Sequence, residues 1–332
     1  GGGRLAERLV TLETSRPELP LSDPEQLAHV EITWEEAQVE PDRFDEPHET
    51  AVLEEYRASD AETTVLFPTG ALRCIRMLER LAAGPLLLLT ADKGHATAAE
   101  LPGDEHAPSI AVHGSVSLMV NYHAIGSFVR RRDGLALHPS HSAAHLTVAA
   151  YLLGGAPDGF RDTAAAYARA IDDGGPDDVY AVKKALESHF DTLTPEQLLA
   201  FVRLCGWDAK VFLDVLPTLT AHAAHAPATV RADLRDAVER VWESYFPIGE
   251  SRDLAYGLGR LLYELGDYAG ALTYFQHSLG LYELDPHRAY ALASCHGVLG
   301  DRALASAWLD RALELDPAFA PALELRGTLA SL

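Results

Sequence analysis

The sequence predicts an α/β segment followed by an all-α array that runs to the end of the chain. Three observations predict this fold class. In residues 1–155, short apolar runs of strand length alternate with turn residues. In residues 156–250, apolar residues recur at spacings of three and four, as on one face of a helix. In residues 251–332 the chain aligns with itself at an offset of 34 residues, which indicates repeated helical hairpins.

Length and composition are those of a globular protein with more than one domain. The chain has 332 residues, of which 48% are hydrophobic and 23% are charged. Its formal charge of -22 would repel nucleic acid and anionic membranes, so we expect neither as a partner. The one tight basic run, Arg130 to Arg132, lies beside Asp133 and is most simply a solvated segment before a strand.

Cysteine usage indicates a reducing compartment. Cys74, Cys205 and Cys295 are widely spaced, and each lies among apolar residues of an expected helix, as buried free thiols do. No stretch is apolar enough to span a membrane, and no leader opens the sequence. We therefore expect a cytoplasmic protein. The strong preference for arginine over lysine suggests a GC-rich bacterial genome.

The repeat register holds without a gap between residues 258 and 312. It superposes Leu258 on Leu292, Gly259 on Ala293, Gly266 on Gly300, Ala271 on Ala305, Phe275 on Leu309 and Ser278 on Ala312. Small residues let the two helices of a hairpin approach closely, and the glycines allow the turn between them. The pattern resembles the tetratricopeptide repeat, although alanine stands at the position of its first tryptophan. A third helix from Pro321 would cap the stack.

The resemblance to this repeat family implies protein binding. Stacked hairpins form a concave groove lined by the first helix of each repeat, and such grooves hold extended peptides or helices. We therefore expect a protein or peptide partner, bound by exposed residues of those first helices. The candidates are Tyr256, Arg260, Tyr263, Tyr290, Ser294 and His296. The alternative is that so short a stack simply packs on its neighbour.

The helical array is expected to begin upstream of the repeats. Thr194 precedes Pro195 and lies three residues before Gln197, which is the pattern of a capped helix start. A return helix is expected from Ala209 to Leu216, where Pro217 stops it. A long amphipathic helix is expected from Val230 to Phe246.

Strands and helices alternate in the first part. Strands are expected at residues 5–13, 29–34 and 86–90, a helix at 71–82, a helix or a strand turning into a helix at 115–129, and a closing pair of strands at 135–138 and 145–152. The run from Leu86 to Thr90 has the length and composition of a buried parallel strand.

The loop after that run is where a ligand would bind, because ligands of open α/β sheets lie at the carboxyl ends of the strands. The candidate substrate-binding residues are Asp92, Lys93, His95, Asn121, Tyr122 and His123. Asn121 or His123 could position a substrate amine, and Tyr122 could stack on it. The alternative is that Asn121 and His123 only satisfy backbone groups at a junction of strand and helix.

Three segments, Phe67 to Gly70, Ala91 to Gly94 and Gly114 to Gly126, resemble the later half of the MidA-like S-adenosylmethionine-dependent methyltransferases, in bacterial proteins where that domain precedes tetratricopeptide repeats. The resemblance covers about residues 1–155. It implies a Rossmann-like sheet whose final strands form an antiparallel hairpin, and residues 135–152 fit that hairpin.

The same resemblance implies a methyl-donor site on a glycine-rich loop after the first strand, with an acidic residue after the second. The sequence has neither feature, so it reads as the later portion of such a domain or as a decayed domain kept as a scaffold. We expect no cofactor in this chain, and S-adenosylmethionine only if a missing N-terminal half completes the domain.

Other chemistry finds little support. His138, His141 and His145 would share a face of a helix and could reach one zinc ion, but Pro139 interrupts them and strand residues follow, so we expect no metal site. The Gly114–Ser117 segment lacks the last glycine of a hydrolase nucleophile turn. Enzymatic activity therefore stays open. The chain is either the C-terminal portion of a methyltransferase-like protein whose repeats bind a partner, or a non-catalytic adaptor with a structural α/β part.

Overall fold

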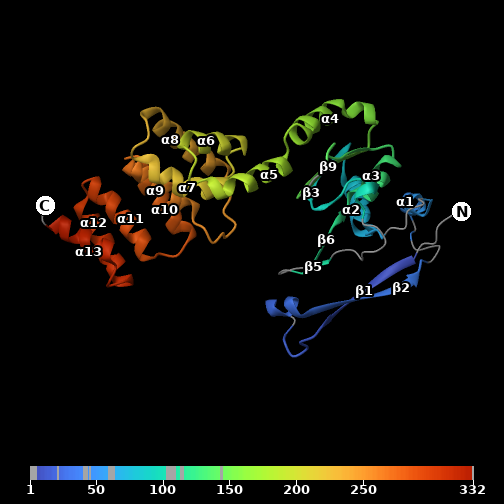
Figure 1. Cartoon of the computed structure of the whole chain (residues 1–332), viewed down its shortest axis with the longest axis horizontal. Coiled ribbons are helices and arrows are strands. Elements are labelled where there is room, and N and C mark those ends of the chain that lie inside the picture. The colour runs from blue at the N-terminus through green and yellow to red at the C-terminus, as the bar shows by residue number, and fades with distance from the viewer. Residues whose placement is uncertain are drawn as a thin grey trace. The chain divides into compact units, whose positions relative to one another are not determined.

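The computed structural model describes residues 6–20, 22–39, 44, 46–58, 64–101, 110–112, 116–142 and 145–330. The chain divides into two compact units, Gly1–Tyr180 and Ala181–Leu332 (Figure 1). The first unit holds small sheets with helices, and the second is entirely helical in its described elements. No helix in the described ranges is long and apolar enough to span a membrane.

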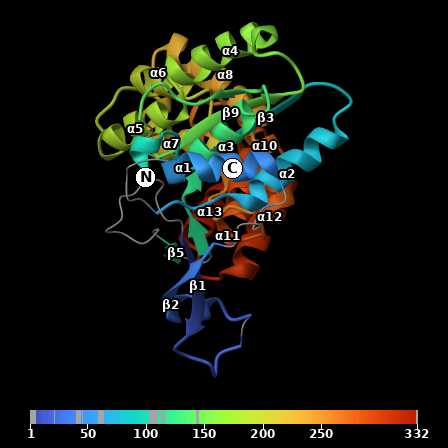
Figure 2. The same ribbon diagram turned by 90° about the vertical axis from the view of Figure 1, so that its right-hand side faces the viewer.

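The first unit begins with a two-stranded antiparallel ribbon, seen in both views of the molecule (Figures 1 and 2). Its strands are β1 (Ala6–Thr14) and β2 (Val30–Gln38), and both expected strands are therefore confirmed. The loop between them is held by the buried side chain of Gln26. Its amide donates to the carbonyl of Leu19 at 2.6 Å, and its carbonyl accepts from Thr14 Oγ1 at 2.6 Å.

A three-stranded sheet, in the order β3-β9-β8, forms the centre of this unit. Its strands are β3 (Leu86–Asp92), β8 (Leu135–Leu137) and β9 (Thr147–Leu153). β9 pairs antiparallel with both neighbours, which confirms the closing pair of strands.

The expectation of a buried parallel strand at Leu86 to Thr90 is wrong. β3 pairs antiparallel with β9, and it is an edge strand within the described sheet. Leu87 and Leu89 point away from the core and are 48% and 67% exposed. A continuous apolar run indicates burial of both faces but carries no information on strand direction, which depends on a partner about sixty residues away.

Three helices cover one face of this sheet: α1 (Pro47–Ala58), α2 (Thr69–Leu81) and α3 (Tyr122–Arg130). Their apolar faces bury Val52, Leu72 and Phe128 in one core with Tyr151 of β9. The expected helix before β3 is thus confirmed as α2. Short strands β5 (Ile110–Val112), β6 (Val116–Leu118) and β7 (Val120–Asn121) precede α3, so the segment after residue 115 is a strand turning into a helix; Gly114 and Ser115 lie outside the described residues.

The first unit continues past residue 155 into α4 (Arg161–Tyr167) and the start of α5 (Pro176–Leu186). The hydroxyl of Tyr167 donates to the carbonyl of Val148 at 2.7 Å. The carboxylate of Asp177 accepts from the amides of His145 and Leu146 at 2.7 and 2.9 Å. These bonds join the helical segment to β9 and to the residues just before it.

The second unit is an array of helical hairpins. Its helices are α6 (Pro195–Leu204), α7 (Ala209–Ala223), α8 (Ala228–Ser244), α9 (Leu254–Glu264), α10 (Tyr268–Leu281), α11 (Pro286–Val298), α12 (Arg302–Leu315) and α13 (Ala320–Ala330). One hydrophobic core extends from Phe190 to Cys295, and a smaller one between Ala289 and Ala322 follows it. The array therefore starts before the repeats, as the sequence predicts.

The expectation that Pro217 stops α7 is wrong, because the helix continues to Ala223. A proline inside a helix leaves the carbonyl four residues earlier without its usual donor. That carbonyl belongs to Leu213, and it accepts a hydrogen bond from Arg252 Nη2. A side chain distant in sequence thus supplies the hydrogen-bond donor that the helix lacks at this carbonyl. Arg252 also pairs with Asp214 at 2.6 Å.

The repeated residues have the roles that the 34-residue register predicts. Gly266 and Gly300 adopt φ of +74° and +87° in the turns within the two hairpins, a conformation that favours glycine. A Cβ at Gly259 would lie 2.6 Å from the ring of Phe275, so only a residue without a side chain allows α9 and α10 to approach so closely. The hairpins α9–α10 and α11–α12 are thus confirmed.

Candidate partner-binding groove

A groove of about 370 Å³ lies over the first helices of the two hairpins, α9 and α11. Five of the six candidates from the sequence line it. They are Tyr256, Arg260, Tyr263, Tyr290 and Ser294. The groove belongs wholly to the second unit. The structure thus brings these side chains to one surface, and their role in binding remains a prediction.

Helix periodicity places the residues of α9 on one wall. Tyr256, Arg260 and Tyr263 are separated by four and three residues, so they face the same side. The helix is anchored at its start by Asp253, whose Oδ1 accepts from the amide of Tyr256 at 2.9 Å. A capped first turn fixes the direction in which the Tyr256 side chain leaves the helix.

The other wall comes from α11, where His287, Tyr290 and Ser294 follow the same spacing. Asp285 caps this helix by accepting from the amide of Arg288 at 2.8 Å. The hydroxyl of Ser294 donates to the carbonyl of Tyr290 at 2.9 Å. Because that proton is already used within the helix, Ser294 contributes shape to the groove more than hydrogen bonding.

Aromatic rings dominate the groove surface. Tyr256 packs against Phe275 of α10 with ring centroids 5.5 Å apart. Phe319, just before α13, packs against His287 at 4.8 Å and Tyr290 at 6.0 Å. Fixed rings of this kind are the typical anchors of protein interfaces, because they offer large contact area at little cost in conformational entropy.

Charge and hydroxyl groups add polarity to this surface. Arg260 is exposed and forms no ion pair with the described residues, and Glu264 follows one turn later on the same helix. Burial raises the pKa of Tyr256 and of Tyr263, so both hydroxyls keep their protons at neutral pH. The groove therefore offers hydroxyl donors, one guanidinium and one carboxylate around an aromatic floor.

Two expectations about these helices need correction. Ser294 is buried, not exposed. His296 is absent from the groove lining, because it lies six residues after Tyr290 and so about 240° further round the helix. The burial of Ser294 depends on the neighbouring hairpin, which periodicity in one helix does not define.

Sequence reasoning also missed groove residues. His287 lies three residues before Tyr290, so the helical spacing was a sufficient signal for it. Phe275 comes from a second helix, and Phe319 comes from the connection to α13. No local pattern marks those two, because their position depends on how successive hairpins stack.

The substrate candidates of the first unit lie at the end of β3, in β4 and at the start of α3. Asp92 ends β3 in an exposed position, and its carboxylate accepts from the amide of Lys93 at 2.7 Å. His95 lies in the short strand β4 (Gly94–His95), which pairs in parallel with β7 and brings His95 beside Asn121. A ligand-binding role for these residues remains a prediction.

Asn121 and His123 take part in a buried polar network at the start of α3. Asn121 Oδ1 accepts from the amide of Ala124 at 2.9 Å and so caps the helix. The hydroxyl of Tyr56 lies 2.8 Å from His123 Nδ1 and 3.3 Å from Asn121 Nδ2. Burial lowers the pKa of His123 and raises that of the buried Tyr122. The Asn121 bond matches the alternative in which these side chains satisfy backbone groups at a junction of strand and helix, whereas His123 contacts a side chain.

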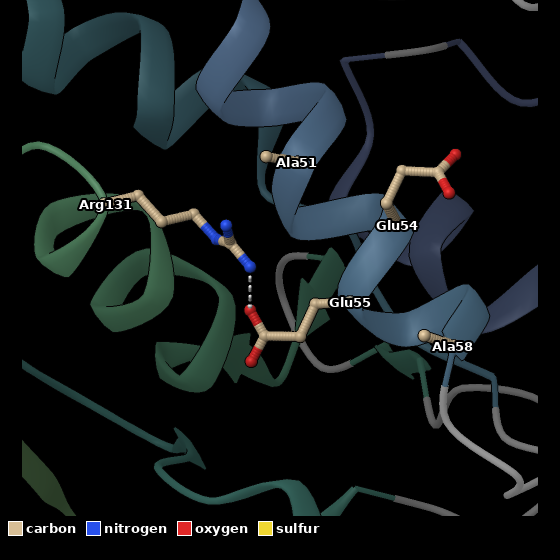
Figure 3. Close-up of a pocket in the computed structure, with 5 residues that line it drawn as sticks. All are labelled: Ala51, Glu54, Glu55, Ala58 and Arg131. Atoms are coloured by element: carbon tan, nitrogen blue, oxygen red, sulfur yellow. Dashed lines mark hydrogen bonds and ion pairs between the residues drawn. The ribbon is translucent and has the colours of Figure 1, made fainter.

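A second hollow lies on the first unit, lined by Ala51, Glu54, Glu55, Ala58 and Arg131 (Figure 3). Arg131 Nη2 points to Glu55 Oε2 across it at 3.1 Å, and Ser127 Oγ donates to the same oxygen at 2.5 Å. Although burial would raise the pKa of Glu55, these two partners lower it overall. None of the substrate candidates lines this open hollow. Of the expected basic run, Arg131 is thus paired, and Arg132 pairs with Glu79 at 2.7 Å.

The three histidines of the metal hypothesis point to different partners. His138 Nε2 lies 3.2 Å from the hydroxyl of Tyr151, His141 lies 4.0 Å from Asp178, and His145 packs on Tyr180. Within the described ranges no three metal-ligating side chains gather around one point.

The three cysteines differ in burial. Cys295 is buried, and its pKa is raised to about 12. Cys205 is half-buried and Cys74 is exposed, so the expectation of buried thiols is wrong for Cys74.

Comparison with known proteins concerns the repeats. The tetratricopeptide repeat family matches residues 253–283 and 287–319. The crystal structure of a thermophilic TPR protein from Thermus thermophilus is similar to 47% of this chain and 90% of its own, with 19% identity and a TM-score of 0.31. No curated protein matches the chain. The family match lies outside residues 1–155, so it gives no support to the methyltransferase resemblance. Residues 253–283 and 287–319 are tetratricopeptide repeats.

Proposed function

We propose that this chain is an adaptor whose tetratricopeptide repeats hold a protein partner in the groove between α9 and α11. The observation that carries the proposal is the convergence of Tyr256, Arg260, Tyr263 and Tyr290 on one groove. Repeats of this family generally mediate contacts between proteins, which agrees with such a groove.

The side chains that line the groove indicate which kind of peptide segment it would bind. Its aromatic surface favours a segment with one or two apolar side chains that insert between Tyr256 and Tyr290. The guanidinium of Arg260, which the described residues leave without an ion pair, favours an acidic residue beside those apolar anchors, because charged partners fix the register of a bound peptide. A short groove of about 370 Å³ suits a few residues rather than a long helix.

Selection from a phage-displayed library of random peptides tests this function. Enriched peptides should share apolar anchors next to an acidic residue, and they should lose most of their affinity for the Arg260→Glu variant. Arg302→Glu is the matched control, because Arg302 is exposed at the start of α12 and does not line the groove. Equal loss of binding in both variants, or no enrichment at all, would contradict the proposal.

A second proposal concerns the first unit and is based on its sheet. We propose that the sheet β3-β9-β8 with α2 and α3 corresponds to the later half of a MidA-like methyltransferase domain. The sheet supports this, because the hairpin of β8 and β9 is antiparallel as that resemblance implies. The edge position of β3, with Leu87 and Leu89 exposed, is compatible with further strands.

Titration with S-adenosylmethionine tests the part of this assignment that concerns the methyl donor, namely that this chain lacks a complete donor site. The described residues offer no glycine-rich loop after a first strand, so calorimetry of this chain should detect no binding. Micromolar binding would contradict the absence of a donor site. The adaptor proposal is unaffected by either result, since it depends on the second unit alone.

A further inference from the structure

The ribbon of β1 and β2 is amphipathic. Its register pairs Val10 with Trp34 and Leu12 with Ile32, so the even-numbered residues of both strands share one face. The odd-numbered face is acidic. It carries Glu7, Glu13, Glu31 and Glu35 and no basic residue. The ribbon therefore has an apolar face and an acidic face.

Within the described residues the apolar face is covered only in part, with Ile32 and Trp34 half-buried. No residue of β1 or β2 belongs to the cores of the molecule, and Leu12 is 47% exposed. A two-stranded ribbon alone is at best marginally stable in water. Apolar and polar residues alternate from Val10 to Glu13 and from Val30 to Glu35, a pattern typical of strands that have one face covered. Another surface is needed to complete it.

The charged pair in the strand register indicates that this other surface is a second copy of the ribbon. Arg8 lies opposite Glu36 at one end of the apolar face, followed by Val10 opposite Trp34 and Leu12 opposite Ile32. If a second ribbon stacks on this face about a two-fold axis parallel to the strands, β1 of one copy lies over β2 of the other. Arg8 then faces Glu36 of the second copy, and each apolar row faces its counterpart. The acidic faces point outward, where their mutual repulsion is smallest.

We infer that two copies of this chain associate face to face through the even-numbered residues of the β1–β2 ribbon. Such sheets stack about 10 Å apart, and the ribbon face measures roughly 30 by 10 Å, which is small for a protein interface. The dimer is therefore weak and depends on concentration. This inference is independent of the peptide groove, although a dimer would carry two grooves.

Sedimentation of the full chain over about 1 to 500 μM measures this association. The wild-type chain should dimerise within this range, and Leu12→Glu should weaken the dimer at least about tenfold, because a charge replaces an apolar contact. Thr11→Glu is the matched control. Thr11 is exposed on the same strand and lies on the acidic face opposite Thr33, so its variant should dimerise as the wild type does.

Mixing two charge variants separates contacts between copies from the effect that a substitution has on the folding of the ribbon itself. Arg8→Glu and Glu36→Arg each place like charges opposite one another, both within a ribbon and between identical copies. In a mixture of the two, the pairs between copies are again of opposite sign, while those within each ribbon stay alike. The mixture should therefore form mixed dimers more tightly than either variant forms its own.

Three results would overturn the inference. The first is a wild-type chain that stays monomeric at the highest concentration. The second is equal dimerisation of the Leu12→Glu and Thr11→Glu variants. The third is a mixture of the charge variants that associates no more tightly than its components, which would indicate that the ribbon face packs on its own chain or on an unrelated protein.

Discussion

Arg288 at the start of α11 donates two hydrogen bonds to one carboxylate oxygen of Asp253 at the start of α9, from Nη2 at 2.8 Å and from Nε at 3.1 Å. The hydroxyl of Ser278 donates to the same oxygen at 2.5 Å. The other oxygen of Asp253 caps α9 at Tyr256. Both partners are well shielded, with side chains 15% and 7% exposed. One ion pair thus joins the two repeats and orients the groove.

Removal of Arg288 should therefore destabilise the repeats. Arg288→Ala leaves the buried carboxylate of Asp253 without its counter-charge, and losing one partner of a buried pair costs about 3 kcal/mol of unfolding free energy. Urea denaturation followed by tryptophan fluorescence measures this, because Trp242 and Trp308 lie in the second unit. Arg311→Ala serves as the control. It breaks an exposed pair with Glu314 and should cost less than about 0.5 kcal/mol.

The bond between Arg252 and the Leu213 carbonyl predicts a coupling with Pro217. Arg252→Ala should lower the unfolding free energy by about 1 kcal/mol, the usual net value of a hydrogen bond. In a Pro217→Ala background the amide of residue 217 can itself donate to that carbonyl, so Arg252→Ala should cost less. The same loss in both backgrounds would mean that Arg252 acts only through its pair with Asp214.

Some groove residues should stabilise the fold as well as bind the partner, and others should only bind the partner. Tyr256 is half-buried against Phe275, so Tyr256→Ala should lower the melting temperature as well as peptide affinity. Arg260 is exposed, so Arg260→Ala should change stability by less than about 0.5 kcal/mol. Calorimetric melting of both variants checks this. A large drop for Arg260→Ala would indicate that it supports the fold rather than a partner.

His138 predicts a loss of stability in mild acid. Burial, with Arg130 and His123 nearby, lowers the pKa of His138 to about 4 from 6.5. The unfolded chain then binds this proton more readily than the folded one, so the stabilisation is complete above about pH 6.5 and is lost as pH falls toward 4. The total change is up to about 3 kcal/mol.

Hydrogen exchange of peptides from α3 and β9 measures this effect in the first unit. Protection should fall between about pH 6.5 and pH 4.5 in the wild type, after correction for the intrinsic exchange rate. His138→Phe removes the titrating ring but keeps an aromatic side chain beside Tyr151, and it should show a smaller fall. An identical fall in both proteins would assign the acid sensitivity to other groups.

Local signals in the sequence predicted the repeats well. The glycines at 266 and 300 and the small residue at 259 have steric roles within one hairpin, so a single chain segment contains the whole reason for them. The same holds for the capped start of α6 at Thr194. Long-range features were not accessible. The rescue of the Leu213 carbonyl by Arg252, the direction of β3 and the groove position of Phe319 each depend on a distant element.

If the groove of the repeats recognises a peptide through Arg260, reversing the charges on both sides of that contact should restore binding that either reversal alone removes. The selected peptide is measured by fluorescence anisotropy against the wild type and Arg260→Glu, first with its acidic residue and then with lysine in that place. Each single reversal should weaken binding at least about tenfold, and the double reversal should restore most of the affinity. Equal weakening by the single and double reversals would contradict recognition through Arg260.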